Sequence, residues 1–257
     1  MARGARGGEP GVWQRRVEGF VLGQVGAPPA RVLEVGCGDG ELARALGRAG
    51  HSVTAIDPHA PVPRPEREEE GPDFRSVGIE GFFGPGPFDH VVAVLSLHHV
   101  EDLSGAVEKM AGLLGAGGSL VVVEFAWDRM DEDTARWAAR RLPETHSPGH
   151  ASWLEHCRHG VPHAVPRGEP HEGGEGRRAA SAANVARWAR EHGLHDSRTL
   201  REALGSRFVQ TFFEWGPYLY ADLDDTSEAE ELEAIEAGEI NATAFRFVGV
   251  GRASAES

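Results

Sequence analysis

The segment 31–46, "RVLEVGCGDGELARAL", most strongly limits what this chain can fold into. "RVLEV" is a short, nearly continuous apolar run, typical of strands that parallel sheets bury on both faces. Beyond the glycines, apolar residues repeat at helical spacing from Leu42 to Ala49, and Gly50 is placed to end a helix. A second strand follows at 52–57, "SVTAID". The pattern predicts a βαβ unit with a right-handed crossover, whose first strand and helix are joined by a glycine turn.

Further apolar patterns extend this unit along the chain. Ser227 and Glu230 have the spacing of a capping box, which predicts a helix running towards Gly238. The other expected elements are a helix at 12–24, a weak strand at 73–80, a strand at 88–97, a helix through Leu114 that ends in glycines, and strands at 119–125, 207–215 and 240–251. This alternation predicts a doubly wound, mostly parallel α/β sheet of seven strands, with the last two strands pairing as an antiparallel hairpin at one edge.

The alternation fails after Trp127, where short helical patterns mix with prolines, glycines and histidines. We interpret that region as an inserted helical cap. The expected organisation is a tail and helix at 1–29, a cofactor-binding core at 30–126, a cap or lid at 127–206, and strands and a helix at 207–257 that complete the core.

Composition excludes several classes of partner. The formal net charge of −14 opposes a nucleic-acid partner, because proteins that bind polyanions usually gather positive charge. No apolar run approaches the roughly 18 residues of a membrane helix, and the N-terminus lacks the apolar stretch of a signal peptide. Cys37 and Cys157 are too few for a disulfide framework. We expect a cytoplasmic protein that acts on small molecules, of an oligomeric state that the sequence does not indicate.

The glycine turn lies where a doubly wound sheet binds its ligand. A dinucleotide fold favours G-x-G-x-x-G, whereas this chain has G-x-G-x-G with Glu41 in the place of the third glycine. Glu34 and Asp39 add two carboxylates, which suits a ligand with a positive centre such as a sulfonium. Asp57 ends the second strand, where a carboxylate can accept hydrogen bonds from ribose hydroxyls. The missing third glycine disfavours a nicotinamide-dependent oxidoreductase.

Four segments together carry a resemblance to a known family: "VLEVGCGDGELA", "VTAIDP", "FDHVVAVLSLHHVEDL" and "LLGAGGSLVVVEF". Over about residues 30–125 the chain resembles the class I S-adenosylmethionine-dependent methyltransferases. Its tail resembles, more loosely, a small-molecule-type, uncharacterised branch of that family. The resemblance implies S-adenosylmethionine as the cofactor and a Rossmann-like fold. It also implies a set of cofactor-binding residues: Gly36, Gly38 and Gly40 at the methionine part, Asp57 at the ribose, Ile79 and Glu80 beside the adenine, and Leu95 in a wall near the sulfonium that extends to His98. From their charges we add Glu34, which contacts the ligand or supports its loop, and Asp39 to this cofactor-binding set.

Two groups of histidines could have a chemical role, one as a general base and the other as metal ligands. His98 and His99 are candidates for a general base, although in the family the matching rings often build the pocket wall. In the cap, His156, His159 and His163 have a spacing that could hold zinc, but Gly160 and Pro162 interrupt a helix there. We therefore expect a histidine-rich lid surface and no metal site.

The sequence thus predicts an enzyme that transfers a methyl group to an oxygen, nitrogen or carbon atom of a small-molecule acceptor. The alternative is a protein that binds S-adenosylmethionine or S-adenosylhomocysteine without catalysis, as a sensor or an assembly partner.

Overall fold

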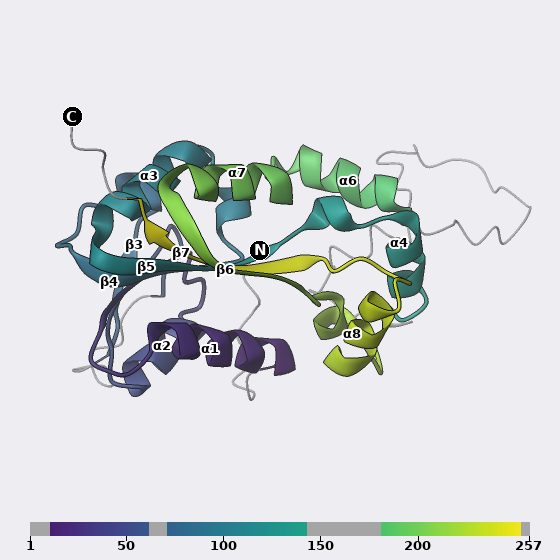
Figure 1. Cartoon of the computed structure of the whole chain (residues 1–257), viewed down its shortest axis with the longest axis horizontal. Coiled ribbons are helices and arrows are strands. Elements are labelled where there is room, and N and C mark those ends of the chain that lie inside the picture. Colours follow the sequence, from purple (N-terminus) through teal and green to yellow (C-terminus); the bar gives the residue numbers. More distant parts are fainter. Residues whose placement is uncertain (1–10, 62–70, 143–180, 253–257) are drawn as a thin grey trace, which may run out of the picture. The chain divides into compact units, whose positions relative to one another are not determined.

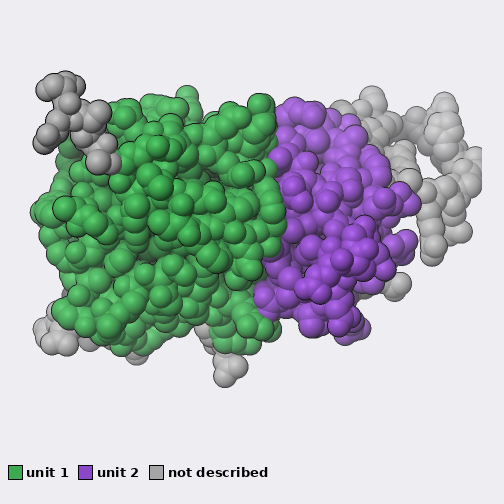
Figure 2. Space-filling model, viewed as in Figure 1, with its two compact units in different colours: residues 1–125, 195–215, 244–257 green, residues 126–194, 216–243 purple. Residues whose placement is uncertain are grey.

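The computed structural model describes residues 11–61, 71–142 and 181–252. The chain divides into two compact units, coloured separately in Figure 2. Unit 1 comprises residues 1–125, 195–215 and 244–257, and unit 2 comprises residues 126–194 and 216–243. Within the described ranges, the helices are too short or too polar to cross a lipid bilayer.

Unit 1 is built on a seven-stranded sheet of order β3-β2-β1-β4-β5-β7-β6. Its strands are β1 Arg31–Val35, β2 Ser52–Asp57, β3 Asp73–Ser76, β4 Phe88–Val94, β5 Leu114–Phe125, β6 Phe208–Gly216 and β7 Ala244–Gly251. Neighbouring strands from β3 to β5 run parallel, and β7 runs antiparallel to β5. The predicted fold class, a mostly parallel sheet that ends in antiparallel pairing at one edge, is confirmed.

Four helices cover the two faces of this sheet, α1 and α2 on one face and α3 and α7 on the other (Figure 1). They are α1 Val12–Val25, α2 Glu41–Arg48, α3 Leu103–Leu113 and α7 Ser197–Arg207. In α1, Trp13, Val17, Val21 and Val25 are buried at helical spacing. The central strands are buried on both faces, as their continuous apolar runs require.

Several predicted boundaries differ from the structure: the strand expected at 88–97 ends at Val94, the one expected at 73–80 ends at Ser76, and the one expected at 240–251 begins at Ala244. α3 ends at Leu113, and the glycines expected to terminate it form the irregular start of β5. The register between β4 and β5 shifts between Phe88 and His90. A Cβ at Gly118 would lie 2.9 Å from the Asp89 carbonyl oxygen, so a glycine permits the close approach of the two strands there.

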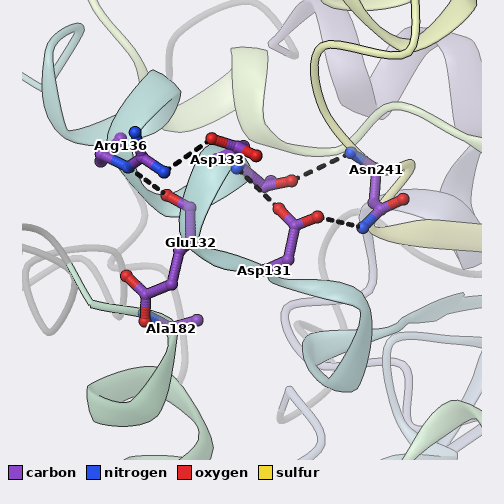
Figure 3. Close-up of polar contacts among 7 residues, drawn as sticks. Asp131, Glu132, Asp133, Arg136, Ala182 and Asn241 are labelled. Atoms are coloured by element: carbon purple, nitrogen blue, oxygen red, sulfur yellow. Dashed lines mark hydrogen bonds and ion pairs between the residues drawn. The ribbon is translucent and has the colours of Figure 1, made fainter.

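Unit 2 contains three described α-helices, α4 Glu132–Ala139, α6 Ala182–Glu191 and α8 Glu228–Glu236. Asp131 caps α4 through the N–H of Thr134 and accepts a second bond from the Asn241 side chain at 2.8 Å, while Glu132 accepts the N–H of Ala182 at 3.0 Å (Figure 3). The N-terminus of α4 thereby joins segments that are distant in sequence.

α8 begins with the predicted capping box, in which Ser227 and Glu230 each hydrogen-bond the other's backbone N–H. In the same helix Glu231 is fully buried, and its carboxylate accepts the N–H groups of Tyr218, Leu219 and Tyr220 at 2.7–3.2 Å. The residues that follow β6 are therefore held by α8.

The boundaries of the two units do not coincide with those of the four segments expected from the sequence. Residues 195–206, part of the cap expected at 127–206, belong to unit 1, because α7 packs beside α3. Residues 216–243 belong to unit 2. The histidine-rich stretch with His156, His159 and His163 lies outside the described residues, so the expected lid remains a prediction.

Candidate active site

The carboxyl ends of β1, β2, β4 and β5 meet at one edge of the parallel sheet in unit 1. The predicted cofactor residues lie on the connections that leave these ends. This edge is where doubly wound sheets bind ligands, so we describe the candidate site strand by strand.

The turn between β1 and α2 is anchored on β2. Gly36 and Cys37 both donate their N–H to the Ile56 carbonyl, at 2.8 and 3.1 Å. Gly36, Gly38 and Gly40 all have positive φ, and Gly40 is the N-cap of α2. Glycine is therefore favoured at this turn for its conformation.

Asp57 at the end of β2 connects the glycine turn to the next loop. One carboxylate oxygen accepts the N–H of Gly38 at 3.1 Å, and the other accepts the N–H of His59 at 2.7 Å. The side chain is 18% exposed. Since each carboxylate oxygen has two lone-pair sites, the anchored carboxylate can still accept hydrogen bonds from a diol.

Glu34 lies inside β1 and is 3% exposed. Its Oε2 is a buried polar atom that has no hydrogen-bond partner within the described part of the chain. Burial, together with the negative charges of Asp39 and Asp57, raises the pKa of Glu34 to about 8. The site thus contains a buried acid that a nearby cation would stabilise in its ionised form.

Asp39 and Cys37 occupy opposite environments in the same turn. Asp39 is exposed, and its backbone carbonyl accepts a bond from the Arg44 side chain at 2.7 Å. Cys37 is buried, and burial with the charge of Glu34 raises its thiol pKa to about 12, which makes it a poor nucleophile.

Ile79 and Glu80 lie in the short helical turn after β3, η1 Ile79–Gly81. Ile79 is 2% exposed, whereas Glu80 is exposed and its carbonyl accepts a bond from Lys109 at 2.8 Å. β3 pairs with β2 up to Asp57, so this turn leaves the sheet next to the anchored carboxylate. An adenine ring needs an apolar side chain against its plane and a polar group at its edge. Ile79 and Glu80 are side chains of these two kinds.

The segment after β4 forms a tight turn at the same edge. Leu95 has φ +49°, and the turn continues into η2 Leu97–His99. His98 is buried, whereas His99 is exposed, with the two ring centroids 4.2 Å apart. The predicted wall and the two candidate bases therefore share one rigid turn.

Ser96 brings this turn against the glycine turn. A Cβ added at Gly36 would lie 2.2 Å from the Ser96 Cβ, and the Ser96 hydroxyl donates to the Val35 carbonyl at 2.8 Å. Sequence reasoning included Ser96 only as part of the wall from Leu95 to His98 and did not predict its contact with Gly36.

Glu124 is a residue that sequence reasoning missed. It is fully buried near the end of β5, and its carboxylate contacts the turn after β4. The signal was present in "SLVVVEF", where an acid interrupts an apolar run as Glu34 does in "RVLEV".

Two observations test whether these residues suit a sulfonium nucleoside with an amino-acid tail. The unpartnered oxygen of Glu34 belongs to a buried acid that a positive centre beside it would stabilise in its ionised form. The glycine turn leaves backbone, not side chains, facing the edge of the sheet, with Asp57 positioned for a diol. The donor set fits such a ligand.

The comparisons with known proteins agree with this geometry. A model of the methyltransferase domain family matches residues 10–159. An uncharacterised methyltransferase of Mycobacterium tuberculosis is 41% identical over 98 residues, which are 37% of this chain and 50% of that protein. A ubiquinone biosynthesis O-methyltransferase of Xylella fastidiosa is 41% identical over 157 residues, covering 54% of this chain and 64% of that enzyme. The chain therefore spans about half to two thirds of these relatives.

Among solved structures, the N-methyltransferase NodS of Bradyrhizobium japonicum in complex with S-adenosylhomocysteine has the same fold. Its TM-score is 0.54 at 15% identity, over 95% of this chain and 90% of that one. Because the family model matches more than half of the residues, the chain belongs to the methyltransferase domain family.

Proposed function

We propose that this protein is an S-adenosylmethionine-dependent methyltransferase that acts on an oxygen, nitrogen or carbon atom of a small molecule. The observation that carries the proposal is the acidic glycine turn, where Oε2 of Glu34 is buried without a hydrogen-bond partner among the described residues and Asp57 is anchored on the N–H of Gly38. The names of the relatives, which include an O-methyltransferase that acts in ubiquinone biosynthesis, favour a small-molecule acceptor. A cytoplasmic location remains a prediction from composition.

The bound cofactor would supply an already activated methyl group on sulfur, so the protein has to bind, orient and exclude water. Gly36, Gly38 and Gly40 admit the methionine part to the backbone, with Glu34 and Asp39 as the negative groups near it. Asp57 holds the ribose, and Ile79 with Glu80 flanks the adenine. Orientation of two reactants can contribute roughly 7–11 kcal/mol to the lowering of a barrier.

The turn from Leu95 to His98 would form the wall beside the reacting centre. His98 or His99 would accept a proton from an oxygen or nitrogen acceptor that needs deprotonation. An acceptor that is already nucleophilic would need only alignment by this wall.

The ribose assignment predicts the behaviour of Asp57→Ala. We expect the affinity for S-adenosylhomocysteine to fall about 10- to 100-fold, because hydrogen bonds to a charged group contribute about 1.5–3 kcal/mol. Isothermal titration calorimetry measures this directly.

Asp89→Ala is the matched control. Its exposed carboxylate also accepts a backbone N–H, that of Arg31 at 2.7 Å, but from the start of β1 and not from its carboxyl end. Equal affinities for wild type and Asp57→Ala, or an equal loss in both variants, would contradict the assignment.

The rival function is binding without transfer. Incubation with methyl-labelled S-adenosylmethionine and a cell extract separates the two: a labelled small-molecule product supports the enzyme, whereas binding with no labelled product supports a sensor or assembly partner.

A further inference from the structure

Glu124 makes an unusually complete set of contacts for a buried acid. Its side chain is 0% exposed, and the Oε1 atom accepts the N–H groups of Ser96 at 2.9 Å and Leu97 at 2.6 Å. The Oε2 atom lies 2.6 Å from Nδ1 of His98 and accepts the N–H of Phe125 at 3.3 Å. Burying a carboxylate costs free energy unless its oxygens have hydrogen-bond partners. The four contacts supply these partners for Glu124.

Three of these four contacts reach a single turn. Leu95 has φ +49°, in the left-handed region that is unfavourable for a residue with a side chain. The two N–H groups that follow Leu95 both point at Glu124, which holds the turn in this conformation. The His98 carbonyl in turn accepts the N–H of His195 at 3.0 Å, so the segment that precedes α7 holds the other side of the turn.

The contacts of Glu124 also determine which nitrogen of His98 carries a proton. Because Oε1 accepts two backbone N–H groups and Oε2 accepts a third, the carboxyl group acts as an ionised acceptor. Nδ1 of His98 must then be a donor. In the neutral ring, Nε2 is left with its lone pair.

Nε2 is the other nitrogen of the His98 ring. Within the described residues it has no hydrogen-bond partner, and it is absent from the fully buried polar atoms that lack one. His98 as a whole is 7% exposed, and its turn follows β4 at the edge of the sheet where the candidate site lies.

We propose that Glu124 is a positioning residue: it fixes the turn from Leu95 to His98 and holds neutral His98 as the Nδ1–H tautomer, with Nε2 directed to accept a proton from the acceptor. The first two parts depend only on the fold, and the last rests on the proposed function. The same pairing of a carboxylate with a histidine sets the tautomer in other sites where histidine acts as a base or a ligand.

Nitrogen-15 NMR of histidine-labelled protein without cofactor tests the tautomer. Spectra are recorded at about pH 8.5, where free imidazole is neutral, and the His98 signals are identified by their loss in His98→Gln. We expect a protonated Nδ1 and an unprotonated Nε2. A neutral ring protonated on Nε2 would overturn the proposal, as would a ring that carries both protons.

Glu124→Gln tests the cause. A glutamine has one acceptor oxygen, which the N–H groups of Ser96 and Leu97 require, so its NH2 group would face Nδ1 of His98. We expect the ring to change to the Nε2–H tautomer. An unchanged His98 spectrum in a folded variant would contradict the role of Glu124, and if the variant does not fold, the wild-type tautomer alone decides.

Glu231→Gln is the matched control, because Glu231 is equally buried and accepts three backbone N–H groups but no histidine. It should leave the His98 signals unchanged. Calorimetry with S-adenosylhomocysteine separates this proposal from the proposed function: a wild-type protein with the Nδ1–H ring that does not bind the ligand contradicts the function alone. In a protein that binds, Glu124→Gln but not Glu231→Gln should weaken affinity, and equal affinities would contradict the role of the turn as a site wall.

Discussion

At the scale of single residues, the candidate site depends on acids placed inside apolar strands. Glu34 could be identified from sequence because an unpaired charge in a buried strand is costly and needs a reason, and Asp57 because it ends the second strand, where a carboxylate can reach ribose hydroxyls. Glu124 is also an acid inside an apolar strand, the fifth one. The prediction for this part of the site instead rested on His98 and His99, which follow the fourth strand. The contact of the Glu124 carboxylate with the His98 ring is evident only from the structure.

The titration of Glu34 gives a prediction at this scale. Burial raises its pKa from 4.5 to about 8, so between these values the folded state holds a proton that the unfolded state releases. Stability should therefore fall as the pH rises from about 4.5 through about 8, by an amount on the order of a few kcal/mol.

Glu34→Gln removes this titration and should flatten the decline between about pH 5 and pH 8 in denaturant-unfolding experiments. Glu41→Gln, an exposed change at the start of α2, should keep the wild-type slope. Parallel profiles for wild type and Glu34→Gln would show that the buried acid does not titrate in this range.

At the scale of elements, the site is formed where the glycine turn after β1 meets the turn after β4. Strand and helix periodicity predicted the first of these two turns and the order of the strands, but not the second turn, because it extended the fourth strand through Leu97. It could not predict the contact between the turns, because the fit of Ser96 against Gly36 depends on the register of β1 with β4. For the same reason the glycines after α3 were interpreted as a helix end, although they belong to a register shift in β5.

The contact between the two turns predicts the effect of Gly36→Ala. Its Cβ would lie 2.2 Å from the Ser96 Cβ at a residue with φ +79°, so we expect destabilisation beyond the roughly 1 kcal/mol that left-handed backbone alone costs. Gly23→Ala in α1, where nothing lies within 4 Å, should be neutral or slightly stabilising.

Thermal unfolding of both variants measures this difference. Adding Ser96→Gly to Gly36→Ala should restore part of the lost stability, since it removes the clashing Cβ. No recovery would indicate that the backbone conformation, not the contact between turns, carries the cost.

At the scale of the whole molecule, the strand order β3-β2-β1-β4-β5-β7-β6 confirms the fold class that the alternation of elements predicted. The assignment of segments to units was harder to predict. α7 follows the histidine-rich stretch in sequence yet packs beside α3 in unit 1, and no local pattern encodes a contact between helices that lie so far apart in the chain.

The central claim is that the acidic glycine turn binds a sulfonium nucleoside and not a dinucleotide. A thermal-shift comparison of S-adenosylhomocysteine with NADH tests it most directly. At a hundredfold excess over Kd a ligand stabilises by about 2.7 kcal/mol, or roughly 5–10 °C for a chain of this size. We predict such a rise with S-adenosylhomocysteine and none with NADH; stabilisation by NADH and none by S-adenosylhomocysteine would contradict the account.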